Sequence, residues 1–418
     1  MCGIAGIFNQ KRNLSQNETA LLREMADALV HRGPDEEGFY SSGPVGFAHR
    51  RLSIIDIQSG QQPMVHSESG VCLLYNGEVF NYIELRAELK LKGHRFHTDS
   101  DTEVVLQAYL AYGLEFVNRL NGQFALAIWD PRNMSLLLTR DRVGICPLFY
   151  SFQNNRLCFG SEIKAIKPAL ERRPTLNAGA LDQIFTFWTP VGAETIYQEI
   201  STVQPGEMVL FTPEKVEHKT YWNWLYEPAA ADAVSESTLS SELYELLNDA
   251  TRIRLRSDVP VGTYLSGGLD SSAITALTQK ISPQSLHSFS LSFEEQEYDE
   301  SVFQHSVQSA LNSKHHEIRV SVNDIANQLL ESLQYIECPI LRAAPVPMGL
   351  LSGFVAQQGL KVVLTGEGAD EVFGGYDIFK ETKVRAFWSK QQNSSWRPLL
   401  LKKLYPYMSL PASGGAEY

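Results

Sequence analysis

The apolar residues of this sequence follow two different patterns, one before and one after residue 220, and this change limits the fold more than any other feature. In the first part, short apolar runs such as GIAGIF, VCLLYNG and FALAIWD are bounded by turn residues. Runs of this kind predict strands of buried sheets. An amphipathic stripe in residues 20–30 predicts a helix that packs against them.

The second part alternates strand-like and helical segments. A long helical pattern begins near Ser237, and the segments VPVGTYL, SFSLSF, HEIRV and KVVLT follow with helical patterns between them. This alternation indicates βαβ units around a parallel sheet. We therefore expect two domains, residues 2–220 and residues 237–418, joined by a linker at 221–236 where no strong period is present.

Charge and cysteine content exclude several classes of protein. The chain has 36 Lys and Arg against 48 Asp and Glu, a net charge of −12, which offers no general attraction to nucleic acid or an anionic membrane. No stretch approaches the roughly 20 apolar residues that span a bilayer, and the start lacks a signal-peptide pattern. The expected location is the cytoplasm. The five cysteines are scattered without a C-x-x-C pair, which argues against a disulfide framework and a zinc site.

The most distinctive cysteine is Cys2. Removal of Met1 would place a thiol and an α-amino group with a pKa of about 8 on one residue, which could then act as nucleophile and base. Asn76 and Gly77 follow an apolar run, where a side-chain amide and a backbone N–H could stabilise an oxyanion. Simpler explanations stay open: Met1 can be retained, and Asn-Gly is also the strongest short hairpin signal.

Two charged residues of the first part suit an amino-acid substrate. Arg51, in HRRLSIID, offers a guanidinium fork to an α-carboxylate. Asp101, in TDSDTEVV, offers a carboxylate to an ammonium group. Taken separately, each residue fits a surface ion pair equally well.

The second part contains two glycine-rich segments that suit a nucleotide. VPVGTYLSGGLDSSAITALTQ places glycines and hydroxyls between an expected strand and an expected helix, where backbone N–H groups favour phosphate. Asp270 beside phosphate implies an intervening Mg2+. In VVLTGEGADEVFGG, the carboxylates of Glu367, Asp370 and Glu371 would repel one another unless a cation or a proton relieves them. A flexible linker and a solvated acidic helix start are the alternatives.

The motifs of the first part, MCGIAGIF, HRGPD, AHRRLSIID, YNGEVFNY, TDSDTEVV, NGQFALAIWD and RDRVGICPLFY, together resemble the class II glutamine amidotransferase domain. The resemblance implies an αββα sandwich of the amino-terminal-nucleophile hydrolases, in which Cys2 attacks glutamine and Asn76 with Gly77 holds the oxyanion. The residues that it implies for glutamine binding are Arg51, Leu52, Ser53, Ile54, Ile55, Asn76, Gly77, Glu78 and Asp101. Cys146 departs from the basic residue of many relatives, so we expect a weakened ion pair or domain contact there.

SGGLDSS, SFSLSF and TGEGADEVFGGY resemble the synthetase domain of glutamine-dependent asparagine synthetases, an ATP-pyrophosphatase of the adenine-nucleotide α-hydrolase fold. The resemblance implies that ATP activates aspartate as β-aspartyl-AMP and that ammonia displaces AMP. It assigns Mg2+ to Asp270 and Asp370, the acyl-adenylate step to Glu367 and acceptor binding to Arg342. The residues that it implies for ATP binding are Leu265, Ser266, Gly267, Gly268, Asp270, Ser271, Ser272, Leu291, Thr365 and Gly366.

Several alternatives stay open at this stage. The synthetase domain of the family continues beyond the second motif, so we expect the chain to be truncated at its C-terminus. Glutaminase activity is the activity that we expect it to retain. A related amidotransferase that acts on another carboxylate and a non-catalytic scaffold protein are the other hypotheses. A homodimer is also left open.

The two domains on one chain have a chemical reason. Ammonia that is released into a closed passage between the two sites would stay neutral and therefore reactive.

Overall fold

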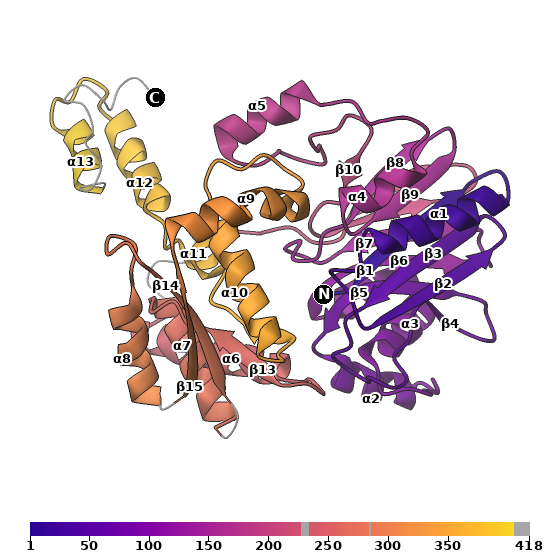
Figure 1. The fold of residues 1–418 in the computed structure, drawn as a ribbon, viewed down its shortest axis with the longest axis horizontal. Coiled ribbons are helices and arrows are strands. Elements are labelled where there is room, and N and C mark those ends of the chain that lie inside the picture. Colours follow the sequence, from indigo (N-terminus) through magenta and orange to yellow (C-terminus); the bar gives the residue numbers. More distant parts are fainter. Residues whose placement is uncertain (227–233, 284–285, 312, 405–418) are drawn as a thin grey trace. The chain divides into compact units, whose positions relative to one another are not determined.

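The computed structural model describes residues 1–226, 234–283, 286–311 and 313–404 (Figure 1). Parts of the predicted linker and of the predicted second domain, residues 227–233 and 405–418, therefore lie outside the described residues. Contacts divide the chain into two compact units. The first unit contains Met1–Gly262, Leu291–Asp299 and Glu317–Val363, and the second contains Thr263–Ser290, Glu300–His316 and the chain from Leu364.

Two six-stranded sheets form the first part of the chain, and all of their described strand pairs are antiparallel. The first sheet has the order β10-β8-β9-β1-β3-β2, with β1 (Gly3–Asn9), β2 (Glu36–Ser42), β3 (Val45–Arg51), β8 (Phe149–Gln153), β9 (Arg156–Gly160) and β10 (Ser201–Thr202). The second has the order β12-β11-β7-β6-β5-β4, with β4 (Met64–Val65), β5 (Cys72–Val79), β6 (Gly122–Asp130), β7 (Ser135–Arg140), β11 (Glu207–Phe211) and β12 (Val216–Thr220).

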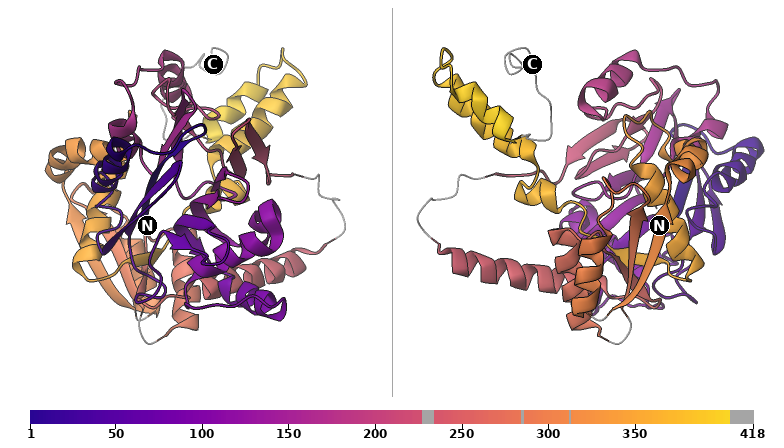
Figure 2. Two further views of the ribbon diagram at one scale, coloured as in Figure 1. Left: turned by 90° about the vertical axis from the view of Figure 1, so that its right-hand side faces the viewer. Right: turned by 60° about the vertical axis from the view of Figure 1, so that its left-hand side comes forward.

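Alternation along the strands creates three apolar layers. In β1, Ile4 and Phe8 belong to the core between the two sheets, whereas Ala5 and Ile7 face α1 (Gln16–Asp27). On the other sheet, α2 (Tyr82–Leu91) and α3 (Asp101–Tyr112) cover a third apolar cluster. The left view of Figure 2 shows α1 on one side of the sheets and α2 and α3 on the other. The predicted αββα sandwich is thus confirmed.

Helix α1 corresponds to the helix predicted at residues 20–30, but its bounds differ. It begins at Gln16 because Ser15 and Glu18 form a capping box. It ends at Asp27, so Val30, which the pattern assigned to the apolar stripe, lies beyond the helix with 42% of its surface exposed.

The second part of the chain contains a four-stranded sheet with the order β15-β14-β13-β16. Its strands are β13 (Val261–Tyr264), β14 (His287–Phe293), β15 (Lys314–Val320) and β16 (Val362–Leu364). β13 and β14 are parallel, with Thr263 opposite Ser288, so the predicted parallel sheet is confirmed. Helices separate these strands along the chain, as the alternating pattern required: α7 (Leu269–Ile281), α8 (Ser301–Leu311), α9 (Val322–Ile336) and α10 (Pro345–Gln357).

The remaining helices are α4 (Ile163–Ile166), α5 (Ala178–Phe187), α6 (Glu236–Arg254), α11 (Ala369–Phe373), α12 (Asp377–Ser389) and α13 (Leu400–Leu404), with short 3-10 turns η1 (Gly113–Arg119), η2 (Lys167–Ala169) and η3 (Arg397–Leu399). Helix α6 is the long helix predicted near Ser237, and Ser235 caps it. Its apolar stripe is buried only near the C-terminal end, at Ile253, whereas Leu239 and Leu246 are exposed.

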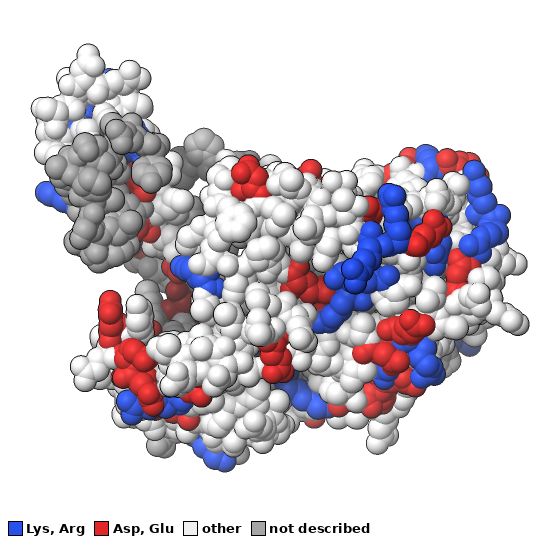
Figure 3. Space-filling view, turned by 45° about the horizontal axis from the view of Figure 1, so that its top comes forward, with Lys and Arg blue, Asp and Glu red and all other residues white. Residues whose placement is uncertain are grey.

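Acidic and basic side chains are mixed on the surface. On the face shown in Figure 3, basic side chains have acidic side chains beside them, and ion pairs such as Arg23–Glu37 and Arg50–Asp27 illustrate this mixing. Among the helices in the described part of the chain, none is both long and apolar enough to cross a membrane.

Candidate functional site

A small pocket of about 50 Å³ contains Cys2 in the first unit. Its lining includes all of the residues predicted for glutamine binding except Ser53 and Asn76. The full set is Met1, Cys2, Arg51, Leu52, Ile54, Ile55, Gly60, Gln62, Tyr75, Gly77, Glu78, Asp101, Thr102 and Gln123. The pocket therefore brings together chain segments that lie far apart in the sequence.

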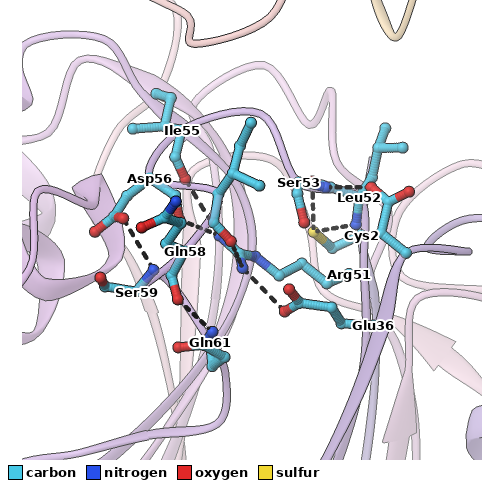
Figure 4. Close-up of polar contacts among 12 residues, drawn as sticks. Cys2, Glu36, Arg51, Leu52, Ser53, Ile55, Asp56, Gln58, Ser59 and Gln61 are labelled. Atoms are coloured by element: carbon cyan, nitrogen blue, oxygen red, sulfur yellow. Dashed lines mark hydrogen bonds and ion pairs between the residues drawn. The ribbon is translucent and has the colours of Figure 1, made fainter.

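The Cys2 thiol lies against the segment that follows β3. Leu52 N–H points to Cys2 Sγ at 3.4 Å, and the thiol donates to Leu52 O at 3.8 Å (Figure 4). The carbonyl oxygen of Cys2 accepts a hydrogen bond of 3.0 Å from Arg32 Nε. Burial raises the pKa of the Cys2 thiol, so a nearby base is needed to form the thiolate.

Burial has the opposite effect on the α-amine at the start of the chain. It lowers the pKa of the Met1 amine, because a charged ammonium is disfavoured away from water. A neutral amine can accept a proton. Removal of Met1 would transfer this amine to Cys2, where it would be bonded to the same α-carbon that bears the thiol side chain.

Asn76 and Gly77 lie inside strand β5 and not in a turn, so the hairpin interpretation of Asn-Gly is wrong. Within the described residues, neither Oδ1 nor Nδ2 of the fully buried Asn76 has a hydrogen-bond partner. An unpaired buried amide is costly unless a ligand satisfies it. A Cβ on Gly77 would meet the carbonyl oxygen of Gln123, so only glycine fits beside β6.

Two carboxylates also line the pocket, that of the buried Asp101 and that of the partly buried Glu78. Burial, together with the neighbouring Asp101, raises the pKa of Glu78 to about 8. Burial likewise raises the pKa of Asp101, although its Oδ2 accepts hydrogen bonds from Tyr75 Oη at 2.8 Å and Val79 N at 3.0 Å. Carboxylates that are hard to ionise in a cavity favour binding of a cation.

Arg51 shapes the pocket through its neighbours. Its guanidinium group donates to Glu36 Oε2 at 2.9 Å and to the carbonyl oxygens of Ile55, Asp56 and Ile57 at 2.6–3.3 Å (Figure 4). These bonds fix the backbone at residues 55–57. We call residues 52–57 the glutamine loop, after the substrate that the sequence resemblance predicts for this segment. Binding of a substrate carboxylate by Arg51 stays a prediction.

Cys146, the departure noted in the sequence, is fully buried and packs against Met1, with Sγ 3.8 Å from Met1 Sδ. Its backbone N–H donates to Asp141 Oδ2 at 3.0 Å, and its carbonyl oxygen accepts from Arg140 Nε at 2.7 Å. Its side chain is therefore an apolar neighbour of the chain start.

The SGGLDSS segment forms the turn between β13 and α7 in the second unit. Gly267 has a φ of +86°, which favours glycine, and a Cβ there would meet Phe303 at 2.8 Å. Gly268 is the N-cap of α7, and Ser266 Oγ lies 2.9 Å from Ser271 Oγ. The hydroxyls and backbone N–H groups at this helix start suit phosphate.

The second glycine-rich turn lies against the first one. A Cβ on Gly366 would meet Ser271 N at 2.7 Å and Asp270 Cβ at 2.9 Å. The turn that follows β16 therefore contacts the N-terminus of α7. Glu367 is exposed in this turn, and Asp370 lies in α11. Carboxylate oxygens are the ligands that Mg2+ prefers, so Asp270 and Asp370 fit the predicted ion by their chemistry.

The other residues predicted for nucleotide or acceptor binding have varied surroundings. Leu265 is buried directly after β13, Leu291 lies in β14, and Thr365 Oγ1 accepts from Glu367 N at 3.4 Å. Ser272 Oγ donates to Gly268 O at 2.6 Å. The guanidinium group of Arg342 lies 4.0 Å from the centre of the Trp188 ring, a cation–π contact.

The sequence analysis missed several pocket residues. Gln62 and Tyr75 contribute to the lining, and Gln62 Oε1 accepts a hydrogen bond from Tyr75 N at 2.7 Å. Arg32 was quoted within HRGPD, but its bond to the Cys2 carbonyl oxygen was not foreseen. These contacts cross long stretches of sequence, so no local pattern marks them.

The fold and the family comparison define a glutamine amidotransferase domain followed by an asparagine synthase domain. Residues 1–222 match the family model for the glutamine amidotransferase domain, and residues 242–416 match the model for asparagine synthase.

Two Bacillus subtilis proteins named asparagine synthetase [glutamine-hydrolyzing] resemble the chain. Protein 1 is 37% identical, over 91% of this chain and 60% of its own length, and protein 3 is 34% identical, over 96% and 67%. Amidase chry2 of Gibberella zeae is 32% identical, over 100% of this chain and 65% of its own length. The chain belongs to the family of glutamine-hydrolysing asparagine synthetases, and it spans 60% of the length of the first relative.

Proposed function

We propose that this chain carries out glutamine-dependent asparagine synthesis. Hydrolysis of glutamine at Cys2 yields glutamate and ammonia, and the ammonia attacks β-aspartyl-AMP formed from aspartate and ATP. The products are asparagine, AMP and pyrophosphate. The observation that supports this proposal most directly is the buried Asn76 amide in β5, which has no hydrogen-bond partner among the residues that the structure describes. The next residue, Gly77, lines the Cys2 pocket, and the chain is a member of this family.

The glutaminase half begins with removal of Met1, after which the α-amine of Cys2 accepts the thiol proton. Cys2 Sγ attacks the side-chain carbonyl carbon of glutamine, and the oxyanion accepts hydrogen bonds from Asn76 Nδ2 and Gly77 N–H. The amine returns its proton to the departing ammonia. Water then hydrolyses the γ-glutamyl thioester to glutamate and the free thiol.

Substrate binding in this half would use the charges around the pocket. Glu78 and Asp101, which line it, would bind the substrate ammonium, whose positive charge favours their ionised forms. Arg51 would bind the substrate carboxylate and, through its bonds to the glutamine loop, orient Leu52, Ser53, Ile54 and Ile55.

The synthetase half uses the two glycine-rich turns. The turn from Ser266 to Gly268, with Ser271 and Ser272, would hold pyrophosphate, and Leu265, Leu291, Thr365 and Gly366 would surround the adenylate. Mg2+ bound by Asp270 and Asp370 would neutralise phosphate charge. Glu367 would promote formation of the acyl-adenylate. The free thiols of all five cysteines agree with a reducing compartment, and we assign the reaction to the cytoplasm.

A second candidate is amidation of another carboxylate, because the whole of this chain also matches a relative, amidase chry2, that is not named asparagine synthetase. Pyrophosphate release in the presence of competing carboxylates separates the two candidates. Aspartate should give the highest kcat/KM under the first proposal, and another acid should do so under the second.

Two variants test the two-site scheme. Cys2→Ala should abolish glutamine hydrolysis and spare the ammonia-dependent reaction, because only the first step needs the thiol. Asp270→Ala should spare glutamine hydrolysis and abolish pyrophosphate release. Equal loss of both half-reactions in both variants would contradict separate sites. Glutamine hydrolysis without any amide formation would restrict the activity of the chain to the glutaminase half.

A further inference from the structure

The glutamine loop of the first unit is held by residues from much later in the chain. Lys361 Nζ donates to Asp35 Oδ2 at 2.6 Å and to Ser53 O at 3.4 Å. The same oxygen of Asp35 accepts a hydrogen bond of 2.7 Å from Ser53 N. Both backbone groups of Ser53 are therefore fixed by the Lys361–Asp35 pair.

This pair lies one residue from the nucleophile contact. Ser53 follows Leu52, whose backbone N–H points to Cys2 Sγ at 3.4 Å. The side chains of Lys361 and Asp35 are 33% and 28% exposed, so the pair is only partly screened by water. Although burial opposes ionisation of Asp35, the bonds from Lys361 and Ser53 outweigh it and hold the pKa of this carboxyl below its usual value.

A second residue that precedes a strand of the four-stranded sheet, Asp258, also contacts the glutamine loop. Asp258 Oδ2 accepts from Asp56 N at 2.7 Å, and Asp258 N donates to Ile54 O at 3.0 Å. Asp258 comes shortly before β13, and Lys361 comes directly before β16. β13 and β16 are neighbours in the sheet. The two segments that contact the loop thus lead, within a few residues, to the two glycine-rich turns.

We propose that Lys361 is a positioning residue for glutamine hydrolysis: through Asp35 it orders Ser53 and the glutamine loop, so that the pocket beside Cys2 is preformed for substrate. This inference rests on the proposed function. If the loop is disordered, the substrate must order it on binding. The apparent affinity for glutamine then falls in proportion to the fraction of molecules whose loop is already ordered. Cys2, directly before β1, and Asn76, within β5, lie outside this loop. The substitution should therefore affect KM more than kcat.

The test uses the full chain with Lys361→Met, Lys361→Arg and a control, Lys219→Met. Lys219 forms a 2.9 Å ion pair with Glu115, but both side chains are more than half exposed. Lys361→Met should raise the KM for glutamine about tenfold and change kcat less than twofold, whereas Lys361→Arg should recover most of the KM. Lys219→Met should match the wild type. An unchanged KM, or a loss confined to kcat, would overturn the proposal.

A double-mutant cycle and a measurement independent of activity complete the test. Asp35→Asn keeps an oxygen for Ser53 N but loses the charge that pairs with Lys361. It should therefore raise KM by itself, and Lys361→Met should add little to it. If the two substitutions raised KM by factors that multiply in the double variant, Lys361 and Asp35 would act independently, which would contradict the proposal. Lys361→Met should also speed hydrogen exchange of the peptide that covers residues 52–57, and Lys219→Met should not. Unchanged exchange overturns the positioning role even if glutamine hydrolysis, and with it the proposed function, fails.

Discussion

Replacement of Glu162 by Gln should destabilise the first domain, because this carboxylate pairs with Arg32 and Lys164 and contacts the His31 ring. Glu162 precedes α4, and its side chain is 8% exposed. Oε1 lies 2.9 Å from Arg32 Nη1 and 3.0 Å from His31 Nε2, and Oε2 lies 2.7 Å from Lys164 Nζ. Arg32 in turn donates to the Cys2 carbonyl oxygen. Loss of the charge therefore affects both stability and the chain start.

The size of the effect follows from the pKa of Glu162. Burial opposes ionisation, but the bonds from His31, Lys164 and Arg32 outweigh it and lower the pKa from 4.5 to about 2. At roughly 1.36 kcal/mol for each pH unit, this difference corresponds to about 3 kcal/mol of unfolding free energy at neutral pH. Since the pKa is depressed in the folded state, this stability is present above pH 4.5 and is lost as the pH falls toward 2.

The assay is urea unfolding of the full chain, monitored by hydrogen exchange in peptides from β5 and β6. These peptides report on unfolding of the sandwich and not of the second part of the chain. Glu162→Gln should be about 3 kcal/mol less stable than the wild type at pH 6, and the difference should shrink by about 1 kcal/mol at pH 3.5. The matched control is Glu115→Gln, in the exposed pair with Lys219, which should change little. A difference near zero at pH 6, or one that does not shrink in acid, would refute the reasoning.

Three further predictions concern the pocket. Asn76→Ala should lower kcat for glutamine hydrolysis by about 100-fold or more with little change in KM, measured by glutamate release; a change in KM alone would argue against an oxyanion role. Because burial raises the pKa of Glu78 to about 8, the wild type should lose stability relative to Glu78→Gln as the pH rises from 4.5 through 8, seen by urea unfolding; a constant difference would oppose this. Mass spectrometry of the mature chain should find Cys2 first, and retained Met1 would leave the thiol without its amine.

Apolar runs in the sequence were sufficient to predict buried strands with a packed helix, whereas the sandwich itself was implied by the family resemblance. Neighbouring residues such as Ile4 and Ala5 face different cores, and this period is a local property of the sequence. The Asn76-Gly77 pair shows the limit of local signals. It has the composition of a hairpin turn, but pairing of β5 with the distant β6 keeps it within a strand.

Packing partners were harder to predict than elements. The apolar stripe of α6 predicted a helix, but Leu239 and Leu246 in this stripe are exposed, because periodicity indicates an amphipathic helix without indicating what covers it. The contact of Lys361 with Asp35 joins residues 326 positions apart. No period or motif links them, so only the folded chain brings them to the glutamine loop.

Transfer of the amide nitrogen of glutamine can be followed with an isotope label. The chain is incubated with amide-15N glutamine, aspartate, ATP and Mg2+, and asparagine is analysed by mass spectrometry. We expect 15N-labelled asparagine from the wild type and none from Cys2→Ala, which should still form labelled asparagine when given 15N-ammonium. Labelled asparagine made from glutamine by Cys2→Ala at the wild-type rate would contradict release of nitrogen at Cys2.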